Sequence, residues 1–409
     1  MLSRTEPNRR FRPQMRLKRF GWLSKSIGSG SMERSPGMSS STVRIFVSAG
    51  DPSGDIAGSL LLEEISKKNN NIEFLGLGGK RMRRTGQEQI VDGSKLAVLG
   101  FWEVARKFLF FKRLMNQAVA MIKETKPKAV ILIDYPGFNL RLAERIKPLG
   151  IPIIYYISPQ IWAWAGGRIK QIKRLVDRML LILPFETEMY NKAGVPNEFV
   201  GHYLLDDIDP RFIKAPYNMD SDLILLMPGS RPQEVQRMLP VLLQSAFLLS
   251  RMGDYRFAIA AVEGNIDYEA YSKNANIPIE VVYGRSRELA AESRLVITSS
   301  GTATLETGII GRPMIVIYKT GMITYMIARR LVKLDNIALI NISAGKRIVP
   351  ELIQGDASAD NIIREAEKYL TDEKYTLNTI RELNEVTDKL AQTGASARVA
   401  ESVMRIINC

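Results

Sequence analysis

The chain has 409 residues, of which 45% are hydrophobic and 24% charged, and its formal net charge is +14. This is the composition of a globular protein of about two domains, and no apolar run reaches the ~18 residues needed to span a bilayer. A single cysteine, Cys409, excludes an intrachain disulfide and a cysteine-based metal site, and a single histidine, His202, excludes a histidine cluster.

Residues 1–42 carry nine Lys or Arg and two Glu, a net charge of +7 that is half of the total. They lack a core pattern, so we expect a disordered basic extension. Three explanations stay open: an organellar transit peptide, a basic tail that binds anionic lipid, or an assigned start upstream of Met32 or Met38. The remaining positive charge favours anionic partners, whereas no recognition motif supports nucleic-acid binding.

Short apolar strands alternate with helices in the first half, which is typical of a parallel α/β sheet. We expect these strands at residues 43–48, 73–77, 129–133, 152–157 and 179–183. The turn GDPSGD (50–55) follows the first strand, and Asp134 follows the third. Ligands of open α/β sheets bind at such strand ends, so Asp134 is a candidate general base, and the two glycines of the turn at 50–55 would let a ligand approach the backbone. One alternative is that Asp134 only caps the helix that follows it, and another is that residues 50–55 form only a tight turn with Asp55 in the first turn of the helix.

Large apolar side chains alternate with cations between residues 98 and 115, among them Phe101, Trp102, Arg106, Lys107, Phe108 and Phe111. Aromatic rings at the acyl boundary with Lys and Arg on anionic headgroups would explain both features, so we predict an interfacial membrane segment. A fully buried helix is the alternative, although four cations within eight residues weigh against it.

After an Asp-rich segment at 206–222, which we interpret as a linker, the strand–turn–helix pattern starts again. We expect strands at 223–227, 256–260, 280–282, 295–297 and 314–318, and a long helix at 232–252. The turn between the first strand and this helix contains Gly229, Ser230 and Arg231. Arg231 lies beside the free N–H groups of a helix start, where it could bind a diphosphate.

The segment 295–318 reads as strand, small-residue turn, short helix and second strand. Ser300, Gly301 and Thr302 place backbone N–H groups at the positive end of that helix, which predicts an anion site. Glu306 lies one turn further along and could accept hydrogen bonds from a ribose diol. The alternative is that the Ser and Thr side chains only cap a buried helix and that Glu306 is a solvated acid of its first turn.

Eight separated motifs occur together: GDPSGD (50–55), IDYPGFN (133–139), YISPQIWAW (156–164), LPFE (183–186), VGH (200–202), MPGSR (227–231), SGTATLE (300–306) and LVKLD (331–335). In this order they resemble the lipid-A-disaccharide synthase family, from about residue 43 to the C-terminal helices. The basic extension lies outside the resemblance.

The resemblance implies an α/β chain of the GT-B class, with two Rossmann-like domains facing an interdomain cleft. It implies an inverting glycosyltransferase that needs no metal or other cofactor. Its substrates would be UDP-2,3-diacylglucosamine and 2,3-diacylglucosamine 1-phosphate, and its further partner an anionic membrane surface. It leaves open whether the chain forms a homo-oligomer.

The resemblance also implies residue roles. Arg231 with Gly229 and Ser230 would face the donor diphosphate, residues 300–302 the nucleotide phosphates and Glu306 the ribose, and Asn341 would lie near the donor. Asp134 would deprotonate the acceptor's 6-hydroxyl. Asp51 is a second catalytic candidate, ranked below Asp134, because it stands where the family usually has Glu, which is one methylene longer and reaches further.

The expected organisation is an extension at 1–42, an acceptor and membrane-facing domain at 43–205, a UDP-sugar-binding domain at 206–357 and C-terminal helices at 358–409. By analogy with related folds, we expect these helices to pack back on the first domain. We expect a cytoplasmic enzyme, peripheral on the inner membrane, or a mitochondrial one if residues 1–42 are a transit peptide. Two other functions stay open: a UDP-N-acetylglucosamine 2-epimerase, which would act without an acceptor, and a binding protein without catalysis, which would release no UDP.

Overall fold

The computed structural model describes residues 42–90, 104–160, 167–264, 266–273, 275–321 and 336–408, with side chains from residue 109 onward in the second of these ranges. The basic extension, apart from its last residue, and the LVKLD motif lie outside the described residues. The residues from Thr42 onward form one compact unit.

The first sheet has seven parallel strands in the order β3-β2-β1-β4-β5-β6-β7. The strands are β1 (Val43–Ala49), β2 (Ile72–Leu77), β3 (Glu88–Gln89), β4 (Ala129–Ile133), β5 (Ile153–Tyr156), β6 (Arg178–Leu181) and β7 (Asn197–Phe199). The helices of this part are α1 (Pro52–Lys68), α2 (Lys80–Arg84), α3 (Val104–Thr125), α4 (Pro136–Ile146), η3 (Lys147–Leu149), α6 (Gly167–Leu175), α7 (Glu186–Ala193) and α8 (Leu204–Asp207).

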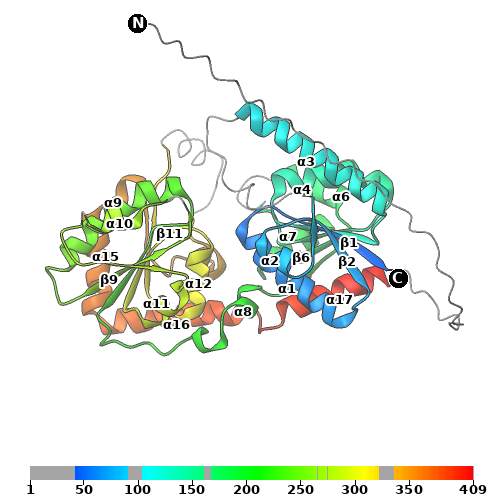
Figure 1. The fold of residues 1–409 in the computed structure, drawn as a ribbon. Coiled ribbons are helices and arrows are strands. Elements are labelled where there is room, and N and C mark those ends of the chain that lie inside the picture. The colour runs from blue at the N-terminus through cyan, green and yellow to red at the C-terminus, as the bar shows by residue number, and fades with distance from the viewer. Residues whose placement is uncertain are drawn as a thin grey trace, which may run out of the picture. The chain divides into compact units, whose positions relative to one another are not determined.

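Helices cover both faces of this sheet, which explains its continuous apolar strands. All five residues of β4 are buried. Ile131 faces the core layer that contains α1, whereas Val130 and Leu132 face the layer that contains α3, α4 and α6. Figure 1 shows α1 and α17 on one face of the sheet and α3, α4 and α6 on the other. The sheet therefore exposes its loops, not its faces, to a ligand.

The second sheet has six parallel strands in the order β10-β9-β8-β11-β12-β13. Its strands are β8 (Leu223–Met227), β9 (Arg256–Ala261), β10 (Glu280–Tyr283), β11 (Leu295–Ser299), β12 (Met314–Tyr318) and β13 (Glu351–Ile353). The helices that follow α8 are η4 (Pro210–Phe212), α9 (Pro232–Leu249), α10 (Tyr268–Lys273), α11 (Ser286–Glu292), α12 (Thr302–Ile310), α14 (Leu339–Ala344), η5 (Gln354–Asp356), α15 (Ala359–Thr371), α16 (Glu373–Lys389) and α17 (Ala395–Ile407). Two parallel sheets with this strand order confirm the predicted pair of Rossmann-like units.

The three C-terminal helices divide between the two sheets. Helix α15 packs on α9 and α16 packs on α12, both beside the second sheet, whereas α17 packs on α1 beside the first. Val399, Ala400 and Val403 of α17 are fully buried in the core layer that contains α1. The predicted domain limits stay a prediction, and the limit after residue 205 falls inside α8.

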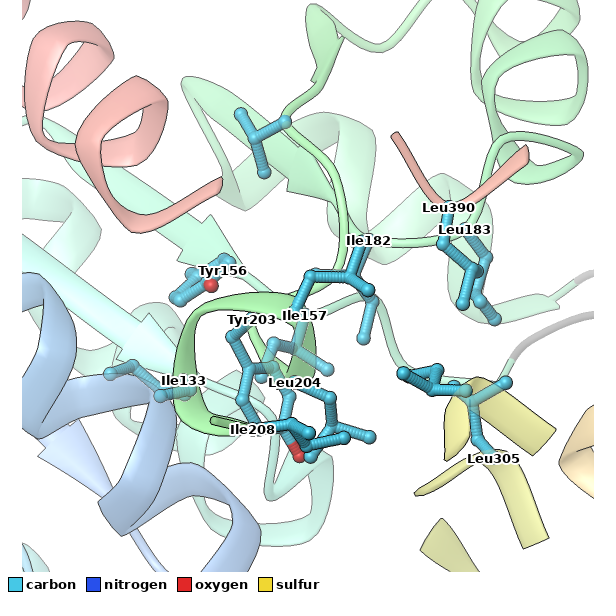
Figure 2. Close-up of a cluster of buried hydrophobic side chains, with 14 of the residues drawn as sticks. Ile133, Tyr156, Ile157, Ile182, Leu183, Tyr203, Leu204, Ile208, Leu305 and Leu390 are labelled. Atoms are coloured by element: carbon cyan, nitrogen blue, oxygen red, sulfur yellow. The ribbon is translucent and has the colours of Figure 1, made fainter. Parts of the chain in front are cut away.

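One buried cluster runs from the first sheet to α12. Figure 2 shows side chains that follow β5 and β6 together with those around α8, and with Leu305 of α12 and Leu390, which follows α16. These residues include Ile157, Ile182, Leu183, Tyr203, Leu204, Ile208, Leu305 and Leu390. A single apolar core layer thus lies beneath the loops that carry the predicted site.

Candidate active site

The predicted site residues flank the two points at which the strand order reverses. In the first sheet β1 and β4 are neighbours at this switch point, and Asp51 and Asp134 follow them. In the second sheet β8 and β11 are neighbours, and Arg231 and Ser300 follow them. Because crossover helices leave the switch point on opposite faces of a sheet, the strand ends there stay open to a ligand.

Asp51 is the N-cap residue of α1. Its carboxylate accepts a hydrogen bond from the N–H of Gly54 at 2.7 Å, and Pro52 begins the helix. Burial raises the pKa of Asp51, and the N–H of Gly54 and the charge of Arg231 only partly offset this rise. Arg231 comes from the second half of the chain, so the two switch points are close enough to interact electrostatically.

Asp134 and Tyr135 both have left-handed backbones, with φ of +44° and +48°. Residues other than glycine rarely adopt this conformation, and the surrounding structure must stabilise it. The N–H of Asp134 donates to the carbonyl of Tyr156 at 2.9 Å. Its carbonyl accepts from the side chains of Asn139 at 2.8 Å and Tyr155 at 2.7 Å. Three neighbours therefore fix the direction in which the Asp134 side chain leaves the strand end.

Burial raises the pKa of Asp134 to about 7, and the nearby charge of Asp51 contributes to this rise. A carboxylate with a pKa near neutral pH can accept a proton during a reaction and is still partly deprotonated at the start of it. Of the two carboxylates, Asp134 thus has the electrostatic setting of a general base.

Gly50 and Asn139 position these carboxylates, and the sequence analysis assigned no role to Asn139. A Cβ at Gly50 would lie 2.2 Å from the ring of Tyr135, so only glycine allows this ring to pack there. Ser48 donates to Asn139 at 2.7 Å, and Asn139 donates to the carbonyl of Ile133 at 3.1 Å. The Asn139 side chain thereby joins the ends of β1 and β4.

The turn after β8 brings Arg231 to the start of α9. Gly229 has φ of +115°, and a Cβ there would lie 2.8 Å from a carboxylate oxygen of Glu234. Arg231 forms an ion pair with Glu234 at 2.8 Å, but its side chain is 76% exposed. Exposed ion pairs are weak, so Arg231 can exchange this partner for an anionic ligand. Ser230 is also exposed.

The turn after β11 leads into α12 at Thr302. The N-cap residue, Gly301, has φ of +153° and ψ of −162°, a conformation essentially reserved for glycine, and no side chain of the cap residue occupies the helix start. The Ser300 hydroxyl donates to the carbonyl of Ile337 at 3.1 Å, and Thr302 is exposed. This geometry fits the predicted anion site.

Glu306 lies further along α12 and contacts Arg287 of α11. Its carboxylate oxygens accept hydrogen bonds from two guanidinium nitrogens of Arg287, at 3.2 and 3.5 Å. Arg287 was not predicted, because no motif or spacing rule connects a residue of α11 to this position. Glu306 is therefore not simply a solvated acid of an exposed turn.

Asn341 is fully buried and its side-chain amide is used within the protein. Its nitrogen donates to the carbonyl of Val349 at 2.9 Å and to Glu351 at 2.7 Å, and its oxygen accepts from the N–H groups of Ile348 and Val349. All four bonds are made within the protein and hold the segment 348–351 against α14. That Asn341 lies near the donor stays a prediction.

The predicted membrane segment is only partly described. Phe101 and Trp102 lie outside the described residues, as do the side chains of Arg106, Lys107 and Phe108. In the described part of α3, Leu109 is 54% exposed. By contrast, Leu114 is buried in the core layer between the first sheet and α3, α4 and α6, and Phe111 is partly buried against the same layer. No helix among the described residues is long and apolar enough to cross a membrane.

A family model for lipid-A-disaccharide synthetase matches residues 45–406. Lipid-A-disaccharide synthases of Geobacter sulfurreducens and Geobacter metallireducens are 40% and 39% identical to the chain over 373 residues, which cover 89% of this chain and 97% of each relative. The chain belongs to the lipid-A-disaccharide synthetase family. This confirms the resemblance carried by the eight motifs.

Solved structures agree with this assignment at the level of the fold. A putative UDP-N-acetylglucosamine 2-epimerase from Listeria monocytogenes is similar with a TM-score of 0.62 and 12% identity, over 90% of this chain and 97% of that one. The glycotransferase of kitacinnamycin is similar with a TM-score of 0.60 and 14% identity, over 89% and 99%. Both likenesses support the GT-B fold class of this lipid-A-disaccharide synthetase family member.

Proposed function

We propose that the chain is an inverting glycosyltransferase that joins UDP-2,3-diacylglucosamine to 2,3-diacylglucosamine 1-phosphate. The products are the β-1,6-linked lipid A disaccharide 1-phosphate and UDP. The observation that carries the proposal is the pairing of two switch points. One provides carboxylates, one of them with a pKa near 7, and the other provides an exposed arginine and a helix start at a glycine. Family membership supports the same reaction.

In the proposed reaction the acceptor's 6-hydroxyl oxygen attacks C1 of the donor sugar. Asp134 takes the hydroxyl proton as the new C–O bond forms. The bond from C1 to the diphosphate oxygen breaks, and its electron pair leaves with UDP. Attack from the face opposite the diphosphate inverts the configuration at C1.

The second switch point would stabilise the leaving UDP. Arg231 exchanges Glu234 for the diphosphate, and the N–H groups at the start of α12 bind phosphate oxygens beside Ser300 and Thr302. Fixed N–H dipoles and a guanidinium can stabilise developing negative charge where it forms. Glu306 would accept hydrogen bonds from the ribose hydroxyls.

We further propose that α3 and the residues before it contact an anionic membrane surface, so that the enzyme is peripheral on the inner membrane. The exposed Leu109 and the neighbouring Lys112 and Arg113 support this orientation. Lipid substrates with two acyl chains would reach the first sheet from that surface.

The deciding experiment measures UDP release by the purified protein with UDP-2,3-diacylglucosamine, with and without the lipid acceptor, in the presence of a chelator. We expect release only with acceptor, and release that survives chelation. Donor turnover without acceptor would instead indicate an epimerase, and no release with intact donor binding would indicate a binding protein.

Asp134→Asn tests the base in the same assay. We expect kcat to fall by about 10²- to 10⁴-fold, because the amide cannot accept the proton, while the dissociation constant of UDP stays within about twofold. Glu73→Gln, an exposed carboxylate of β2, is the matched control and should leave both values unchanged. Near-normal turnover by Asp134→Asn would remove Asp134 from the mechanism.

A further inference from the structure

Arg287 of α11 is anchored by Asp207 of α8. One guanidinium nitrogen donates to the backbone carbonyl of Asp207 at 2.8 Å, and another contacts the Asp207 carboxylate at 2.5 Å. Only 21% of the Arg287 side chain and 7% of the Asp207 side chain are exposed. Two short bonds to one residue fix the plane of the guanidinium, which a single ion pair would not do.

The same guanidinium approaches Glu306, the residue proposed to bind the donor ribose. Its distances to the two carboxylate oxygens are 3.2 and 3.5 Å, longer than the bonds to Asp207. Burial would lower the pKa of Arg287, but Glu306 and Asp207 raise it above its ordinary value. Each carboxylate oxygen keeps lone pairs for further donors, so the pair can still accept hydrogen bonds from a diol.

Asp207 also joins this pair to the first half of the chain. Its carboxylate receives Arg81 of α2 at 2.7 Å. Burial would raise the pKa of Asp207, but its bonds with Arg287 and Arg81 hold it below the ordinary value. The four residues form one continuous chain of charges from α2 through α8 and α11 to α12.

Arg287, Asp207 and Glu306 are largely buried, whereas Arg81 is exposed. Burying ionised groups costs desolvation energy, and apolar residues of similar volume are often at least as stabilising. The network therefore has little value as a source of stability alone. We propose that Arg287 is a positioning residue, which holds Glu306 in the orientation that accepts the ribose hydroxyls and connects the donor site to the first half through Asp207. This inference rests on the proposed donor site at α12.

The test compares the binding of UDP with that of its 2′-deoxy analogue, by titration calorimetry on the full-length protein. The wild type should prefer UDP by about tenfold or more, as expected for a hydrogen bond to a charged acceptor. Arg287→Ala should bind UDP more weakly and reduce this preference to less than about threefold. In turnover it should raise the donor KM while kcat stays within about threefold.

Arg287→Lys keeps the charge but cannot make the two-pronged contact with Asp207, so we expect an intermediate preference. Arg256→Ala is the matched control, because Arg256 forms an exposed ion pair with Asp222 at 2.9 Å on the second sheet. It should keep the wild-type preference. The melting temperature of each variant identifies any that do not fold.

Three outcomes decide the matter. If Arg287→Ala weakens UDP and its analogue equally, Arg287 acts only through general stability and the inference is wrong. If Glu306→Gln keeps the full preference for UDP, Glu306 does not bind the ribose, which overturns both the assignment of Glu306 and the role of Arg287. Loss of the preference in both variants, with the Arg256→Ala control intact, supports the inference.

Discussion

At the scale of single residues, the proposed reaction depends on the pKa of Asp134, which the charge of the nearby Asp51 raises. Burial is the main cause of the raised pKa of Asp134, and the charge of Asp51 is the second. Arg231 acts on Asp51 in the opposite direction. The proton affinity of the proposed base therefore depends on a carboxylate from a different loop.

Asp51→Asn tests this coupling. A general base must be deprotonated, so the rate should rise with pH through the pKa of Asp134, which is about 7. Removing the charge of Asp51 lowers that pKa, so the acidic limb of the kcat/KM profile should move to lower pH by about half a unit or more. Glu73→Gln should not move it. An unchanged limb in Asp51→Asn would mean that Asp134 does not set the profile, or does not sense Asp51.

The site residues at the strand ends could be predicted from the sequence, but the residues that hold them in place could not. Asp134 follows an apolar run directly, and Asp51 and Arg231 lie in the short turns after two others, so that parallel-sheet topology places all three at an open edge. Arg287 reaches Asp207, which lies 80 positions away, and no local pattern signals such a pair. The left-handed backbone of Tyr135 likewise depends on tertiary contacts.

At the scale of elements, buried strands were the most predictable part of the fold. The predicted bounds of β4, β8 and β12 agree with the structure, because each is an apolar run between turn residues. The edge strands β3, β7 and β13 were missed. They have two or three residues each and include polar side chains such as Glu88 and Asn197, so they lack the apolar signal of central strands.

The start of α17 is fixed by a side chain from far away in the sequence. The carboxylate of Asp206 accepts hydrogen bonds from the N–H groups of Gly394 at 2.5 Å and Ser396 at 2.7 Å. Because the residue at the N-cap position is Gly394, no local side chain takes this task. The segment that the sequence suggested as a linker therefore contains a helix cap.

Asp206→Ala should lower the free energy of unfolding by about 1 to 3 kcal/mol, since it leaves the start of α17 without its charged acceptor. Urea titration followed by circular dichroism measures this change. Glu144→Ala, which removes an exposed carboxylate paired with Arg174, should change it by less than about 0.5 kcal/mol. Equal effects in the two variants would contradict the capping role.

At the scale of the whole molecule, charge and exposed apolar surface together bear on membrane contact. Half of the net charge of +14 belongs to residues 1–42. The other half is distributed over the folded part, where α3 combines the exposed Leu109 with the cations Lys112 and Arg113. A surface of this kind can bind anionic lipid both by burying apolar side chains and by electrostatic attraction.

Leu109→Ser should reduce sedimentation with phosphatidylglycerol-containing vesicles by about fivefold, because an exposed leucine loses the free energy of entering the acyl boundary. Leu377→Ser is the matched control, since Leu377 of α16 is 47% exposed and Leu109 is 54% exposed. Similar losses in both variants would remove α3 from the proposed membrane surface.

The position of α17 also has a consequence for synthesis on the ribosome. Val399, Ala400 and Val403 complete the core layer against α1, although they are translated after the whole of the second sheet. At translation rates of about 5 to 20 residues per second, the sequence between α8 and α17 takes roughly 10 to 40 seconds to emerge. During that interval the apolar side chains of α1 that later contact α17 stay uncovered, so we expect the first half to gain its full stability only after α17 has emerged.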